Sequence, residues 1–196
     1  MMKILQLLSN PPLLAKKIYG PIARAYKLYI LKDEFTVEVT RWFRDKGDKT
    51  LRLDYPELNE ESIVFDLGGY KGDFAYAINK KYGCSVYVFE PHPEYHDACI
   101  KRFLSNDKVI PFNYGLSDKD GKFLLSDSVD GSSFLNPNHK EKNAIECEVK
   151  EIFNVLRQLD ISNISLMKIN IEGGEYPILL HMISEDKLSL VDNYQI

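Results

Sequence analysis

A glycine-rich turn directly after an apolar segment is the part of this chain best suited to chemistry. The apolar segment contains Asp66, and Gly68, Gly69 and Gly72 follow it before a helical pattern begins. Glycine lets the backbone turn tightly and approach a ligand closely. A helix N-terminus adds unpaired N–H groups and a partial positive charge. This combination predicts a site for a nucleotide-like cofactor at the first β–α turn of an open α/β sheet.

An acidic residue at the end of the next expected strand extends this site. Glu90 lies 18 residues beyond Gly72, directly after a strand expected over residues 85–89. At about this distance from the glycine turn, an acidic side chain accepts hydrogen bonds from the ribose hydroxyls of a nucleoside. NAD sites and S-adenosylmethionine sites both use this device. Glu90 therefore predicts a nucleoside without choosing between the two cofactors.

The spacing of the glycines separates these cofactors. A dinucleotide-binding turn needs Gly-x-Gly-x-x-Gly, and aligning its last two glycines on Gly69 and Gly72 puts Leu67 at the first. An aspartate followed by Gly-x-x-x-Gly, as in Asp66, Gly68 and Gly72, is typical of S-adenosylmethionine-dependent methyltransferases. A carboxylate here suits a cofactor with an ammonium group and repels a pyrophosphate. An NAD-binding Rossmann protein is thus the weaker alternative.

The elements that must position these residues alternate between strands and helices from residue 62 onward. Strands are expected over residues 62–67, 85–89, 108–113 and 165–171, and helices over residues 73–82, 93–104, 150–159 and 175–183. Strands separated by helices indicate βαβ units and a parallel sheet. The predicted fold is α/β, a three-layer sandwich around a mostly parallel Rossmann-like sheet. Pro111 favours an edge position for the third strand.

Other regions flank or interrupt this alternation. We expect residues 1–60 to form a helical N-terminal extension and residues 61–196 to form the cofactor-binding domain. Residues 114–148 are rich in turn-forming types around short hairpin-like strands. A fifth parallel strand is expected to begin near Asp192. Because the predicted fold needs more elements than remain before Ile196, we expect the domain to be incomplete at its C-terminus.

Four short motifs occur in order along the expected domain. They are residues 65–73 (FDLGGYKGD), 88–93 (VFEPHP), 113–118 (NYGLSD) and 167–175 (MKINIEGGE). Together they resemble the FkbM-type methyltransferases, a branch of the class I, seven-stranded enzymes, over residues 40–196. The resemblance implies transfer of a methyl group from S-adenosyl-L-methionine to a hydroxyl, on a glycan sugar or a secondary metabolite.

The resemblance also implies roles for individual residues. The methionine end of the cofactor is assigned to Asp66, Gly68, Gly69 and Gly72, the ribose to Glu90, and the adenine to Asn113, Gly115 and Leu116. For Gly115 and Leu116, a turn glycine and a core leucine are an equally good interpretation.

The last motif departs from the family pattern. That pattern reads Lys-x-Asp-x-Glu-Gly, and this chain has Lys168, Asn170 and Glu172. Alternate residues of a strand face the same way, so these three are the candidate catalytic residues. Asparagine cannot accept a proton, so an enzyme that relies on the aspartate would be impaired; otherwise Lys168 or Glu172 would be the base. A catalytically impaired cofactor- or partner-binding fragment is therefore the alternative to an active enzyme.

Charge and composition limit the partners. Residues 1–32 contain six bases and no acid, whereas the rest of the chain has 19 bases and 29 acids. An acidic domain lacks the surface that nonspecific nucleic-acid binding needs. The helix expected from Pro21 carries Arg24 and Lys27 opposite an apolar face, so it either packs on the domain or touches anionic lipid. The expected partner is a small-molecule or glycan acceptor, and a homo-oligomer is left open.

Cysteine usage and the N-terminus bear on the compartment. Cys84, Cys99 and Cys147 are odd in number and lack the short spacing of metal ligands. Reduced thiols in a cytoplasmic protein are therefore expected, and no metal is predicted. The apolar residues 4–8 are too few for a signal-peptide core or a bilayer span. We predict a cytoplasmic location with at most peripheral membrane contact.

Overall fold

A computed structural model describes residues 21–47, 50–126, 144–171 and 173–196. The chain forms two compact units, Met1–Asp54 and Tyr55–Ile196. The boundary between the two units follows Asp54, whereas the sequence pattern placed it after residue 60. Among the described residues, no helix combines the length and the apolar character that crossing a bilayer requires.

The first unit is helical over most of its described residues. Residues 21–26 are α-helical and continue into a π-helical turn, Lys27–Leu31 (η1). The helix α3 follows over Glu34–Arg44. It begins at Asp33, whose carboxylate accepts a hydrogen bond of 2.9 Å from the backbone N–H of Thr36. Such a cap satisfies one of the N–H groups that the first turn leaves free, which fixes where the helix starts.

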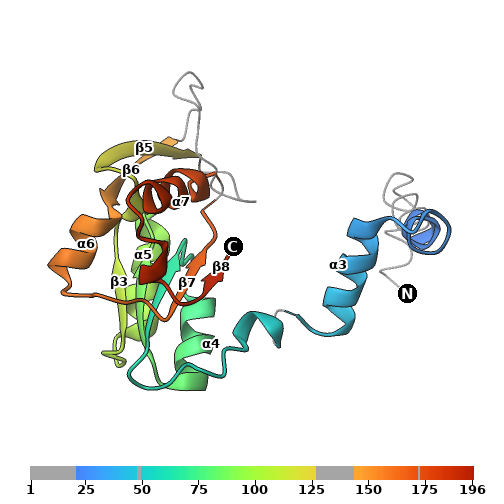
Figure 1. Ribbon diagram of the computed structural model, residues 1–196, viewed down its shortest axis with the longest axis horizontal. Helices are drawn as coiled ribbons and strands as arrows, with labels where there is room; N and C mark the ends of the chain where they lie inside the picture. The colour runs from blue at the N-terminus through green and yellow to red at the C-terminus, as the bar shows by residue number, and fades with distance from the viewer. Residues whose placement is uncertain (1–20, 48–49, 127–143, 172) are drawn as a thin grey trace, which may run out of the picture. The chain divides into compact units, whose positions relative to one another are not determined.

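The second unit is built around a five-stranded parallel sheet (Figure 1). Its strands are β1 (Ile63–Leu67), β2 (Ser85–Phe89), β3 (Val109–Phe112), β7 (Leu166–Ile169) and β8 (Tyr194–Gln195). The spatial order is β3-β2-β1-β7-β8, and every neighbouring pair is parallel. The edge position expected for the strand with Pro111 is confirmed. The order reverses between β1 and β7, which is where open α/β sheets bind ligands.

Helices cover both faces of this sheet, as the alternating pattern predicted. They are α4 (Asp73–Tyr82), α5 (Pro93–Phe103), α6 (Ile152–Gln158) and α7 (Glu175–Ser184), with a short 3-10 turn at Leu188–Leu190 (η3). A further 3-10 turn, Leu51–Leu53 (η2), belongs to the first unit. Helices α6 and α7 contribute to the main hydrophobic cluster together with strands β1, β2 and β7. Helices α4 and α5 pack against β2 and β3.

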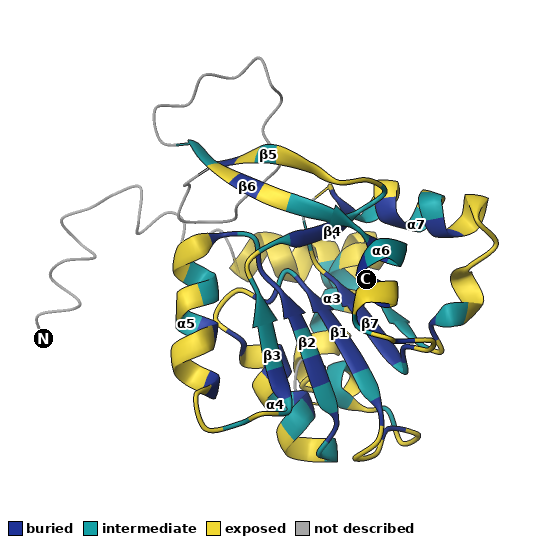
Figure 2. Cartoon of the chain, turned by 90° about the vertical axis from the view of Figure 1, so that its left-hand side faces the viewer, coloured by how far each residue is buried: buried dark blue, intermediate teal, exposed yellow. Residues whose placement is uncertain are grey.

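The inner strands are buried on both faces, which Figure 2 shows as a dark centre of the sheet. In β1, Phe65 and Leu67 enter the main hydrophobic cluster. Successive side chains of a strand point to opposite faces, so Val64 and Asp66 point away from that cluster. All four are at most 1% exposed. Burial of each large apolar side chain contributes about 1.5–3 kcal/mol, which explains why these apolar runs form central strands.

A small second sheet lies at the carboxyl ends of the main strands (Figure 2). It consists of β4 (Gly115–Ser117), β5 (Gly121–Ser126) and β6 (Ala144–Glu151), in the order β4-β6-β5. Strand β6 pairs antiparallel with β5 and parallel with β4. Only two residues separate β3 from β4, so the small sheet continues directly from the edge of the large one.

Candidate functional site

A buried ion pair joins the ends of β1 and β7. The register of the two strands places Asp66 beside Lys168, and the Lys168 Nζ lies 2.8 Å from Asp66 Oδ1. The ammonium also donates to the carbonyl of Gly68 at 2.8 Å. Both side chains are at most 4% exposed. The sequence suggested that Asp66 meets the ammonium of a cofactor, but the ammonium beside it here belongs to Lys168. A direct contact between Asp66 and a cofactor stays a prediction.

The glycine turn lies directly above this pair and is held by close backbone packing. Gly68 and Gly72 have φ angles of 76° and 77°, a region that favours glycine. A Cβ atom on Gly68 would meet the carbonyl oxygen of Asn170 at 2.1 Å, and one on Gly69 would meet the Val88 side chain at 2.1 Å. The turn therefore needs these glycines to fit against neighbouring strands, whether or not a ligand contacts them.

Glu90 occupies the end of β2, where the glycine turn and the start of α5 meet. It is 6% exposed. One carboxylate oxygen accepts from the backbone N–H of Tyr70 at 2.7 Å, and the other accepts from that of His92 at 2.9 Å. Burial raises the pKa of the Glu90 carboxyl to about 7 from an ordinary value of 4.5, and the two backbone hydrogen bonds offset only part of this rise. The two backbone N–H groups thus orient the carboxylate, and no cation of the described residues forms an ion pair with it.

The two residues whose backbone N–H groups hold Glu90 carry rings that both contact Tyr95. The rings of His92 and Tyr95 stack with centroids 4.3 Å apart, and Tyr95 meets Tyr70 edge-on at 4.5 Å. Tyr70 has a φ of 50°, so the turn places three alternate residues in the left-handed region. The sequence did not single out Tyr70 or Tyr95. Tyr70 lies inside the first motif, residues 65–73, and Tyr95 lies two positions after the second, residues 88–93, and this proximity was the available signal.

The residues assigned to adenine have packing roles in the structure. The Asn113 amide donates to the backbone carbonyls of Glu90 and Pro91, at 3.2 Å each, and so fixes the end of β2. Gly115 is buried, and a Cβ atom there would lie 3.2 Å from the side chain of Val149. Leu116 is 3% exposed within the main hydrophobic cluster. Leu116 is therefore a core residue in this structure, and its contact with an adenine stays a prediction.

The end of β7 places Asn170 beside the glycine turn. Its backbone N–H donates to the carbonyl of Leu67 at 3.1 Å, and its side chain is exposed. Glu175 holds the following loop, since its carboxylate accepts from the N–H groups of Ile171 and Gly173. Glu172, the third candidate catalytic residue, lies outside the described residues. Lys168 and Asn170 thus lie near the same turn, Lys168 beneath it and Asn170 at the surface.

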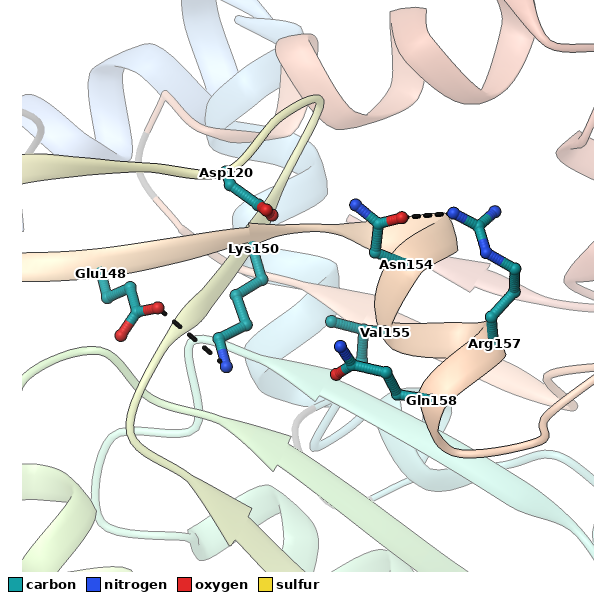
Figure 3. A pocket seen from close by; sticks show the side chains of 7 residues that line it. All are labelled: Asp120, Glu148, Lys150, Asn154, Val155, Arg157 and Gln158. Atoms are coloured by element: carbon teal, nitrogen blue, oxygen red, sulfur yellow. Dashed lines mark hydrogen bonds and ion pairs between the residues drawn. The ribbon is translucent and has the colours of Figure 1, made fainter.

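A polar pocket is formed by other residues, which come from β6, α6 and the turn before β5 (Figure 3). It has a volume of about 430 Å³ and is lined by Asp120, Glu148, Lys150, Asn154, Val155, Arg157 and Gln158. Lys150 lies 4.0 Å from Glu148, and Arg157 is hydrogen-bonded to Asn154. Its charges are thus of both signs, so the pocket does not select an ion of one sign. Within the described ranges, no group of three His, Cys, Asp or Glu side chains is placed to hold a metal ion.

The strand order, the glycine turn at its reversal and the acid that follows β2 define an α/β protein of the type that binds ligands at the carboxyl ends of its parallel strands. The family model for the methyltransferase FkbM domain matches residues 66–196. The chain therefore belongs to the FkbM methyltransferase family, and its second unit has the Rossmann-like fold expected from the sequence. A search of curated proteins found no match.

Proposed function

We propose that this protein transfers a methyl group from S-adenosyl-L-methionine to a hydroxyl group of a glycan or a small metabolite. The observation that supports the cofactor best is the Glu90 carboxylate, which is buried beside the glycine turn and held by two backbone N–H groups. Each carboxylate oxygen accepts about two hydrogen bonds, so each retains room for one more. Two neighbouring ribose hydroxyls fit this arrangement.

Two features favour S-adenosyl-L-methionine over NAD. Leu67, at the position of the first dinucleotide glycine, is 1% exposed and packs in the hydrophobic core. The Lys168 ammonium beneath the turn is paired with Asp66, so it does not offer a free positive charge to a pyrophosphate. The residues of the turn therefore suit a ligand without phosphate groups.

When bound, S-adenosyl-L-methionine supplies a methyl group that its sulfonium already activates, so the protein mainly has to align the acceptor. We assign Asn170 to this alignment, because its exposed amide can hydrogen-bond a hydroxyl at the end of β7. Lys168 holds Asp66 and the Gly68 carbonyl and is thereby assigned to support of the turn. Glu172 is the residue that we propose to take the hydroxyl proton.

Calorimetric titration tests the cofactor. S-adenosyl-L-methionine is expected to bind and NAD is not. Glu90→Gln is expected to weaken binding strongly, because the amide replaces one of the two acceptor oxygens with an NH₂ donor that cannot accept from a ribose hydroxyl. Glu94→Gln is the matched control, since Glu94 is exposed in the first turn of α5. Absence of heat with S-adenosyl-L-methionine in folded protein would overturn the proposal.

A second candidate function is cofactor binding without efficient transfer. The observation that favours it is Asn170, which stands where the family pattern has an aspartate. Asn170→Asp, assayed against a panel of hydroxyl acceptors, separates the two. A gain of about 10²-fold or more, typical of an added general base, would support the impaired form. An unchanged rate of methyl transfer would support an active enzyme whose general base is a residue other than Asn170.

We further propose that the start of the first unit contacts an anionic lipid surface. Ile22, Tyr26 and Tyr29 are exposed on the first unit, as are Arg24 and Lys27. Residues 1–32 carry six bases and no acid, a charge complementary to such a surface. Aromatic and aliphatic side chains beside cations are typical of helices that lie at a membrane interface.

Sedimentation with phosphatidylcholine vesicles, with and without phosphatidylglycerol, tests this contact. Binding is expected only with the anionic lipid, and it should weaken with salt and in the double variant Arg24→Gln, Lys27→Gln. Arg41→Gln is the control, since Arg41 pairs with Glu38 on α3. No binding to either vesicle would contradict the contact and favour a helix that packs on protein.

A further inference from the structure

The imidazole of His92 is buried without a hydrogen-bond partner. The residue is 3% exposed, and neither Nδ1 nor Nε2 has a partner in the part of the chain that the structure describes. A neutral imidazole always carries one N–H donor and one acceptor nitrogen. Because buried polar groups in folded proteins almost always have partners, such a pair of unmatched atoms indicates a role that the protein alone does not fulfil.

The local structure gives no reason for an imidazole at this position. His92 occupies the N-cap position of α5, but its side chain makes no capping hydrogen bond. The backbone N–H of His92 holds Glu90, and this contact needs no particular side chain. The ring stacks on Tyr95, which a phenyl ring would do equally well. Packing on Tyr95 therefore explains an aromatic ring at this position. Neither packing nor capping explains why the ring carries two nitrogens.

The position of the ring indicates what the nitrogens meet. His92 and Tyr70 donate to the two oxygens of the Glu90 carboxylate, at 2.9 and 2.7 Å. Tyr95 lies between their rings. His92 thus contacts Glu90 through its backbone, and its imidazole lies against the neighbouring ring of Tyr95. A hydroxyl that donates to Glu90 still has acceptor lone pairs, which an imidazole N–H can use.

We propose that His92 is a cofactor-binding residue whose imidazole hydrogen-bonds a ribose hydroxyl of the nucleoside held by Glu90. The inference rests on the proposed binding of S-adenosyl-L-methionine. Since both nitrogens are covered in this structure, the contact requires a side-chain rotation of His92 on binding, a change that is common at binding sites. His92 and Glu90 together would then select a nucleoside with an intact ribose.

Calorimetry with S-adenosyl-L-homocysteine tests the contact. His92→Phe keeps a stacking ring and removes both nitrogens, and it is expected to weaken binding about tenfold, the effect of one lost hydrogen bond. His96→Phe, in the same helix but without a contact to Glu90, is the control. The 2′-deoxy and 3′-deoxy forms of the ligand are expected to identify the hydroxyl. Loss of that hydroxyl should weaken binding about tenfold more in the unchanged protein than in His92→Phe, because the variant has only the Glu90 contact left to lose.

Thermal melting without ligand provides a second readout. His92→Phe is expected to raise Tm, because it removes two unmatched buried polar atoms. If the variant does not fold, ¹⁵N-histidine NMR of the unchanged protein replaces it, with a shift of the His92 ring nitrogens expected on addition of S-adenosyl-L-homocysteine.

Three results would overturn the inference. They are equal affinity of the unchanged protein and His92→Phe, a fall in Tm, or ring nitrogens that do not respond to the ligand. If the unchanged protein does not bind S-adenosyl-L-homocysteine at all, the proposed function is overturned together with the His92 contact. If it binds and His92→Phe binds equally well, only the His92 contact is overturned.

Discussion

Two buried carboxylates lie at the ends of neighbouring strands, and the protein treats them in opposite ways. Asp66, in β1, is fully buried and pairs with the Lys168 ammonium at 2.8 Å. Glu90, directly after β2, is 6% exposed and is held by two backbone N–H groups. The first carboxylate is paired with a cation of the same domain, whereas the second is oriented by backbone groups and has no paired cation within the described ranges.

From this difference we infer two roles, support of the glycine turn for Asp66 and binding of a ligand for Glu90. Removing water from a charge is unfavourable unless a partner replaces it, and at Asp66 the partner is a lysine of the same domain. At Glu90 the removal of water is only partly offset. Burial therefore disfavours the charged form and raises the pKa of the carboxyl to about 7. Folded proteins tolerate such a group where a ligand completes it. We therefore propose that Asp66 stabilises the turn and that Glu90 is the group available to a cofactor.

Breaking the Asp66–Lys168 pair is expected to have the largest effect on stability. Lys168→Met leaves the Asp66 carboxylate buried without its cation and should lower the free energy of unfolding by about 3–5 kcal/mol. Urea unfolding monitored by circular dichroism measures the loss. The double variant Asp66→Asn, Lys168→Met should regain much of it, because no uncompensated charge remains.

Lys150→Met is the matched control for that experiment. Lys150 lies 4.0 Å from Glu148 at the protein surface, and exposed pairs contribute about 0–1 kcal/mol. A similar loss of unfolding free energy in Lys168→Met and Lys150→Met would show that the Asp66–Lys168 pair has no special structural role. It would contradict the contrast between Asp66 and Glu90.

The pH dependence of stability is expected to report Glu90. A carboxyl whose pKa is higher in the folded than in the unfolded state makes the folded protein lose stability as pH rises between the two values. For Glu90 these are about 4.5 and about 7. The contribution amounts to roughly 3 kcal/mol. Urea unfolding of the unchanged protein and Glu90→Gln across this range should show a difference that grows with pH and is constant above about pH 7.

Cofactor affinity is expected to change with pH in the opposite sense. Ribose hydroxyls need an ionised carboxylate as acceptor, so protonation of Glu90 below about pH 7 should weaken binding. One pH unit below the pKa, about a tenth of the carboxyl is ionised, so the affinity should fall roughly tenfold. Calorimetry with S-adenosyl-L-homocysteine at several pH values measures this effect. An affinity that is independent of pH between about 5 and about 8 would contradict it.

Much of the main sheet could be predicted because its signals are local. The apolar run before Asp66 and the helical patterns after each strand gave the alternation, and the position of Pro111 at an edge followed from the missing N–H of proline. Strand β6 was missed, although Ile145, Cys147 and Val149 alternate with charged residues in the manner of a strand. Turn residues on its N-terminal side obscured that pattern.

The partners of the site residues could not be predicted from the sequence. Asp66 and Lys168 are 102 positions apart, and only the parallel register of β1 and β7 brings them together. The same limit applies to Leu116, whose apolar side chain fits a cofactor slot and a core equally well until its neighbours are known. The type of a residue indicates which contacts its side chain could make. The strand register decides which partner it meets.

The most direct test of the contrast between the two carboxylates is the unfolding free energy of Glu90→Gln at about pH 8, with and without S-adenosyl-L-homocysteine. Without ligand, the variant should be more stable than the unchanged protein. At a ligand concentration about 100 times the dissociation constant, the unchanged protein should gain about 2.7 kcal/mol and the variant far less. A variant that is less stable without ligand, or that gains as much from it, would contradict the assignment of Glu90 as the carboxylate kept for the cofactor.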